Sequence, residues 1–146
     1  MSEEEINCKL VLIGDVNVGK TSIISRYVNG EFENKVNSTI DASYKIKTVY
    51  FKQFKQSIKF IIWDTAGQEN FRSLNKFFYR DAYIVIFVYD ISNKKSFNEI
   101  KDYWYKEVKS NSINNQSKKI FYFKKLKKKK FFFLIYLLFS LCNCRK

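Results

Sequence analysis

An eight-residue loop, Gly14-Asp15-Val16-Asn17-Val18-Gly19-Lys20-Thr21, constrains this chain more than any other stretch. It fits the pattern G-x-x-x-x-G-K-[ST] of phosphate-binding loops. An apolar run at 9–13 precedes it and a segment able to form a helix, 21–29, follows it. Glycine lets successive backbone N–H groups point inward, and a helix start adds free N–H groups and a positive dipole end. The stretch therefore predicts an anion-binding loop, with a chance glycine turn as the alternative.

A second stretch, Trp63-Asp64-Thr65-Ala66-Gly67-Gln68-Glu69, directly follows a strand-like run. An acid at a strand tip can hold Mg²⁺, and the Gly67 N–H can meet a γ-phosphate. In the first loop, Lys20 is expected to reach the β- and γ-phosphates and the Thr21 hydroxyl to bind Mg²⁺. Both stretches lie beyond strand ends, where open α/β sheets bind ligands.

Apolar and alternating runs indicate an α/β fold with a mainly parallel sheet. Helix-spaced apolar residues at 97, 100, 104 and 108 predict a core-facing helix. The connection at 52–56 lacks glycine and predicts a loose hairpin. The predicted strands are 7–13, 43–51, 57–63, 82–90 and 119–123, and the predicted helices are 20–29 and 97–109.

The net charge of +13 is spread unevenly along the 146 residues. Residues 1–117 hold a net +3, whereas residues 118–146 hold ten Lys or Arg and no acid. The basic signal therefore belongs to the tail and does not predict a nucleic-acid binder. Cys8, Cys142 and Cys144 form no disulfide framework or zinc spacing, which indicates a reducing, cytosolic compartment.

Residues 8–110 carry the motifs GDVNVGKTS, STIDASY, IIWDTAGQENFRSL, FFYRDA and VIFVYDIS. In this combination the chain resembles a Ras-superfamily small GTPase of the Rab branch, and TIDASY is similar to endosomal Rabs. The resemblance implies a P-loop NTPase fold, a Ras-like G domain with helices on both faces of its sheet. It also implies GTP and GDP binding with Mg²⁺, and GTP hydrolysis as a switch in vesicle-mediated transport. Rab-type effectors and regulators, and a cytoplasmic place on the periphery of endomembranes, are implied as well.

The resemblance assigns further roles residue by residue. Thr39 matches the Mg²⁺-binding threonine of the first switch, and Phe32 matches an aromatic that packs on guanine, or else is an ordinary loop anchor. Gln68 matches the glutamine that orients the attacking water and is the one expected catalytic residue. Tyr44, Trp63 and Phe78 match an aromatic trio that faces effectors, with plain packing as the alternative. The expected nucleotide contacts are Gly14, Asp15, Asn17, Val18, Gly19, Lys20, Thr21, Ser22, Phe32, Thr39, Asp64 and Gly67, of which Thr21, Thr39 and Asp64 would hold the metal.

Within the printed sequence the pattern departs from the family after the fifth predicted strand. No Asn-Lys-x-Asp, the family's guanine-reading motif, occurs in it. We therefore expect a partial G domain at 1–123, incomplete after the fifth strand, and a separate tail at 124–146.

The tail has an unusual composition. Of residues 117–146, 25 of 30 are Lys, Asn, Phe, Tyr, Ile or Leu, all encodable by A and T alone. Translated intron or frameshifted sequence would have this composition, and the chain would then be a truncated, non-catalytic product. The alternative is a membrane-associating segment, since a polybasic run beside the apolar run 131–142 suits an anionic membrane surface.

Overall fold

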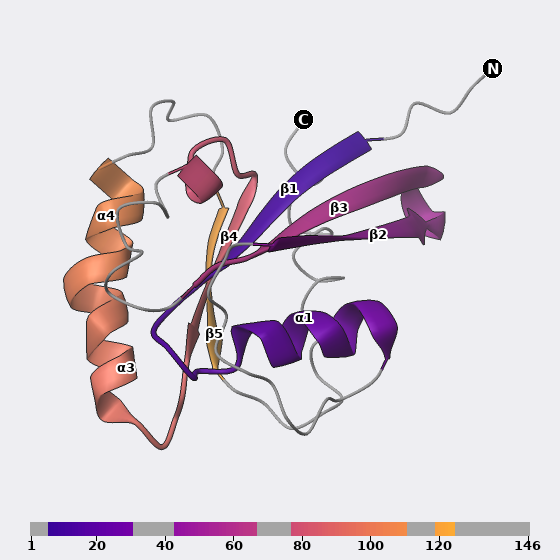
Figure 1. Cartoon of the computed structure of the whole chain (residues 1–146). Helices are drawn as coiled ribbons and strands as arrows, with labels where there is room; N and C mark the ends of the chain where they lie inside the picture. The colour runs from indigo at the N-terminus through magenta and orange to yellow at the C-terminus, as the bar shows by residue number, and fades with distance from the viewer. Residues whose placement is uncertain (1–5, 31–42, 67–76, 111–118, 125–146) are drawn as a thin grey trace.

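A five-stranded sheet forms the centre of the computed structural model, which describes residues 6–30, 43–66, 77–110 and 119–124 (Figure 1). The strand order is β2-β3-β1-β4-β5. β1 pairs in parallel with β3 and β4, and β4 pairs in parallel with β5, whereas β2 runs antiparallel to β3. The strands are β1 (Ile6–Ile13), β2 (Ser43–Phe51), β3 (Gln56–Asp64), β4 (Ile84–Tyr89) and β5 (Lys119–Lys124).

Helices cover both faces of this sheet, which confirms the predicted α/β class (Figure 1). Helix α1 (Lys20–Asn29) lies on one face. The other face carries a continuous helical stretch of α3 (Lys94–Glu99), a π-helical turn (Ile100–Trp104) and α4 (Tyr105–Ser110). Within the described residues, none of the helices combines the length and apolarity that crossing a bilayer requires.

The predicted helix 97–109 begins earlier, at Lys94, because Asn93 caps it. The Asn93 side chain accepts a hydrogen bond from the Lys95 backbone N–H at 3.0 Å, which satisfies one of the free donors at the helix start. Three of the four predicted core positions on this stretch, Ile100, Trp104 and Val108, are buried, and the fourth, Phe97, is half-buried against Tyr89.

Two apolar clusters, one on each face, hold the sheet between its helices. Alternate residues of β1 point to opposite faces, so Leu10 and Leu12 pack toward α1 while Val11 and Ile13 pack toward α3 and α4. The second cluster also contains Trp104, which is fully buried. Both motif loops begin where these central strands end, so the core fixes their relative position.

The β2–β3 hairpin is tight, and the expectation of a loose connection was wrong. Pairing continues to Phe51 and Gln56, and a 3₁₀ turn (Lys52–Phe54) closes the loop. Lys55 takes the left-handed conformation, with φ 48° and ψ 43°, and donates its N–H to the Lys52 carbonyl at 3.3 Å. A lysine here occupies the backbone region that glycine usually fills at such turns.

Candidate nucleotide-binding site

The loop between β1 and α1 is shaped by two glycines for different reasons. At Gly14 a Cβ atom would lie 2.1 Å from the Val88 carbonyl oxygen, so only glycine allows the loop to pass this close to β4. At Gly19 the backbone is left-handed, with φ 93°, and this residue caps the start of α1. Asn17 is also left-handed, with φ 61°. Left-handed residues within a loop allow successive backbone N–H groups to point into one concavity, as an anion site requires.

The Lys20 side chain is buried and bridges back over the loop. Its Nζ donates to the carbonyl oxygen of Gly14 at 3.0 Å and to that of Asp15 at 2.8 Å. Burial lowers the pKa of Lys20 from 10.5 to about 8, against the opposing attraction of Asp64 and Asp15. A desolvated ammonium group held at a helix start gains strongly from an incoming anion, because the charge pair forms away from water.

The end of β3 brings Asp64 to the same place. The Thr21 hydroxyl donates a hydrogen bond to the Asp64 carboxylate. Burial has the largest effect on this carboxylate and raises the pKa of Asp64, while the hydrogen bond and the attraction of Lys20 and Lys45 oppose the rise. Asp64 Oδ1 is buried and has no hydrogen-bond partner among the described residues. The next residue, Thr65, anchors the strand end by donating to the Leu12 carbonyl at 2.7 Å.

Thr21 and Asp64 fit a Mg²⁺ ion. Mg²⁺ prefers oxygen ligands and is commonly held by one or two protein side chains together with phosphates and water. A hydroxyl and a carboxylate meet here, and one carboxylate oxygen is buried without a partner in the described part of the chain. The structure therefore brings the Thr21 hydroxyl and the Asp64 carboxylate into hydrogen-bond contact, and their role as ligands of Mg²⁺ stays a prediction.

The sequence of this chain is similar to the sequences of known proteins. The Ras family is matched over residues 9–126. The chain belongs to the Ras family. The relatives reported below bear Rab names. The chain is 48% identical to Ras-related protein Rab-32D of Dictyostelium discoideum over 106 residues, which are 73% of this chain and 45% of the relative. It is 43% identical to Rab-22A of Homo sapiens over 107 residues, which are 73% of this chain and 54% of the relative.

A third relative, Rab-1 of Theileria annulata, is 39% identical over 118 residues, 81% of this chain and 53% of the relative. These matches identify a Rab-like member of the Ras family. The chain spans about half the length of the curated relatives it matches.

In this Ras-family chain the predicted aromatic trio is assembled in space. The ring centroids of Tyr44 and Trp63 are 5.2 Å apart, and so are those of Trp63 and Phe78. Trp63 also lies under the Lys9 ammonium group, 5.6 Å from the ring centroid. Tyr44 is 56% exposed while the other two are half-buried, so the trio offers aromatic surface from β2, β3 and the helical residues at 77–79.

The other predicted site residues divide into two groups. Phe32, Thr39, Gly67 and Gln68 lie outside the described residues. Within the described part, Val18 belongs to the apolar cluster between the sheet and α1, which also contains Leu10 and Leu12, so Val18 can contribute only its backbone to a ligand. Ser22 is half-buried in the first turn of α1.

Two polar residues beside the site were not predicted. Lys45 on β2 donates to the Ser25 hydroxyl of α1 at 3.1 Å. Lysines alternate with Tyr44, Ile46 and Thr48 along β2, and this alternation was the only signal in the sequence that one face of the strand carries charge.

Proposed function

We propose that the chain is a Rab-like guanine-nucleotide switch, dependent on Mg²⁺, that acts in vesicle-mediated transport on the cytoplasmic side of endomembranes. The observation that carries this proposal is the group formed by the buried Lys20 and Asp64 and the half-buried Thr21 near the start of α1. Its chemistry suits a polyphosphate with a bound metal ion. The Rab names of the relatives support the assignment to membrane traffic.

Each residue then has a defined task. Lys20 binds the β- and γ-phosphates, while Thr21, Asp64 and Thr39 hold Mg²⁺. Mg²⁺, when bound, neutralises charge on the phosphate oxygens. Gln68 orients the attacking water.

The nucleotide state is passed on through the two segments that carry Thr39 and Gly67. Their contacts with the γ-phosphate side of GTP are lost on hydrolysis, and the segments are released. Rab-type effectors and regulators would read this change at the trio of Tyr44, Trp63 and Phe78, whose stacking places one exposed ring next to two half-buried ones.

The test is binding of a fluorescent GDP analogue with and without Mg²⁺. We expect Lys20→Ala to weaken affinity at least about tenfold, since a charge-assisted contact worth about 1.5–3 kcal/mol is lost. Gln68→Leu is the matched control: it should slow GTP hydrolysis and leave binding intact. Equal binding by wild type and Lys20→Ala would refute the proposed site.

Base selectivity needs a separate experiment, because the guanine-reading motif expected from the family does not occur in residues 1–146. A bidentate carboxylate contact to the base is worth roughly 3 kcal/mol. Calorimetric titration with GTP and with ATP is therefore expected to show a small preference for GTP. A large preference would mean that another residue of this chain reads the base.

A further inference from the structure

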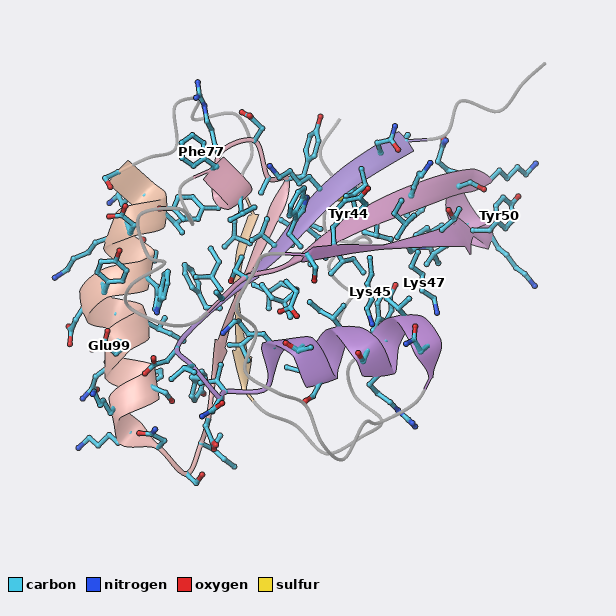
Figure 2. All side chains as sticks on the ribbon, viewed as in Figure 1. Tyr44, Lys45, Lys47, Tyr50, Phe77 and Glu99 are labelled. Atoms are coloured by element: carbon cyan, nitrogen blue, oxygen red, sulfur yellow. The ribbon has the colours of Figure 1, made fainter. Side chains whose placement is uncertain are left out.

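The inner face of β2 carries two lysines that point at α1. Lys45 lies opposite Ile62 of β3, and Lys47 lies opposite Phe60. Both of these β3 residues are buried in the apolar cluster between the sheet and α1. Residues directly opposite in antiparallel strands share a face, so both lysines face the helix. Figure 2 shows the two side chains between β2 and α1. They make different contacts there.

Lys47 bonds to the far end of α1. Its Nζ donates to the carbonyl oxygens of Tyr27 at 3.0 Å and of Val28 at 3.2 Å, and it lies over the Tyr27 ring. These carbonyls belong to the last turn of the helix, where a cation is favoured by the helix dipole. Lys47 therefore caps α1 away from the nucleotide loop.

Lys45 bonds nearer to that loop, at the middle of α1. Its Nζ donates to the Ser25 hydroxyl at 3.1 Å, and Ser25 is only 2% exposed. Ser25 lies one helical turn after Thr21, so both side chains are on the same side of α1. Thr21 in turn donates to Asp64. Lys45, Ser25, Thr21 and Asp64 thus share the space between α1 and the β2–β3 pair.

Lys45 and Asp64 are also neighbours across the two strands. Asp64 lies opposite Ser43, two residues before Lys45, so the two charged side chains are on one face in diagonal positions. Diagonal neighbours of this kind are within reach of a long side chain. Burial raises the pKa of Asp64, and the charge of Lys45 is one of the groups that oppose this rise.

We propose that Lys45 is a positioning residue of the nucleotide site, which ties β2 to α1 through Ser25 and serves as a resident counter-charge for Asp64 when Mg²⁺ is absent. This rests on the proposed function for the role of Asp64 as a metal ligand. A fixed cation beside a metal ligand stabilises the metal-free site and opposes Mg²⁺. Removing the charge should therefore destabilise the metal-free protein and tighten Mg²⁺ binding.

The test uses the full chain loaded with a fluorescent GDP analogue. The measured quantity is the Mg²⁺ concentration at which the rate of analogue release falls to half. For Lys45→Gln, which keeps a hydrogen-bond donor but removes the charge, we expect that concentration to fall about fivefold. Lys45→Arg should match the wild type. Lys47→Gln is the matched control, since its charge is removed from the same face of β2 at the other end of α1, and it should not change the Mg²⁺ dependence. Equal values for Lys45→Gln, Lys47→Gln and wild type would overturn the proposal.

Thermal unfolding of the same loaded chain separates this inference from the proposed function, because it measures the stability of the fold and not the release of the analogue. The fall in melting temperature caused by Lys45→Gln should be larger in EDTA than in Mg²⁺, whereas that caused by Lys47→Gln should be the same in both. Equal falls for Lys45→Gln in the two buffers would overturn the role of Lys45. Failure of the wild type to retain the analogue at any Mg²⁺ concentration would instead overturn the proposed function.

Discussion

Position 14 requires glycine because the backbones of the loop and of β4 come very close together there. The missing side chain leaves room for the Val88 carbonyl oxygen, which a Cβ atom would approach to 2.1 Å. Real Cβ atoms essentially never come so close to a backbone oxygen, so either β4 or the loop must move. The same movement would shift the carbonyl oxygen of Gly14, to which Lys20 is bonded.

We therefore expect Gly14→Ala to reduce the free energy of unfolding by about 2 kcal/mol or more, as overpacking of a close contact does. Gly30→Ala is the control: Gly30 has φ 78° and open space around it, so only backbone strain of about 1 kcal/mol applies. Urea unfolding of the two variants measures the difference. A cost for Gly14→Ala no greater than that for Gly30→Ala would contradict the contact.

A second residue-scale prediction concerns Tyr27, which is buried on α1. Burial raises its pKa from 10.0 to about 12, while the Lys47 ammonium group lies 5.2 Å from its ring centroid. In the unfolded chain the phenol ionises near its ordinary pKa of 10.0, so between about pH 10 and pH 12 only the folded state keeps the proton. Stability should fall as pH rises through this window, by up to about 1.4 kcal/mol per pH unit.

Tyr27→Phe cannot ionise, so this part of the alkaline loss of stability should disappear. Denaturant unfolding at about pH 9 and about pH 11 would measure it, with the wild type compared at each pH. A variant whose stability falls as steeply as that of the wild type would show that Tyr27 does not contribute.

At the scale of elements, β2 has two faces with opposite uses. Its inner lysines bond to α1, while its other face exposes Tyr44, Ile46 and Tyr50. The first of these joins β2 to β3 through Trp63, and Trp63 joins β3 to Phe78. Figure 2 shows Tyr44 and Tyr50 near opposite ends of the strand. The trio is thus a brace between elements as well as an exposed surface.

Because Trp63 is the middle ring, Trp63→Ala should break both contacts and reduce stability by about 2–3 kcal/mol. Tyr44→Ala removes one contact from a mostly exposed side chain and should cost less than about 1 kcal/mol. Denaturant unfolding of both variants compares them. Equal costs would mean that the rings do not stabilise one another through Trp63.

At the scale of the whole molecule, charge is separated along the chain. The last 22 residues, 125–146, carry seven Lys or Arg side chains and no acidic one. We predict that a chain ending at Lys124, which keeps β5 complete, loses binding to vesicles that contain anionic lipid, since each basic residue near such a surface contributes about 1 kcal/mol. Flotation of both forms, with neutral vesicles as the control, measures this. Equal flotation would show that residues 125–146 play no part.

The sequence by itself determined the site loop and most of the elements. The span Lys20–Asn29 of α1 and the span Ser43–Phe51 of β2 were predicted to the residue, because glycine, helix-start and alternation signals are local. The other strands differ by one or two residues at their ends. Thr21 and Asp64, far apart in the chain, could be paired in advance because both follow neighbouring strands of one sheet.

Only the tertiary structure decided which face of β2 turns inward. Alternation has the same period for either choice, and an apolar preference alone would bury Tyr44, Ile46 and Tyr50. Helix α1 reverses that preference, because the Ser25 hydroxyl and the carbonyls of its last turn accept hydrogen bonds from Lys45 and Lys47. Which acceptors face a strand depends on where a helix lands on the sheet, and that position is set by packing of the whole core.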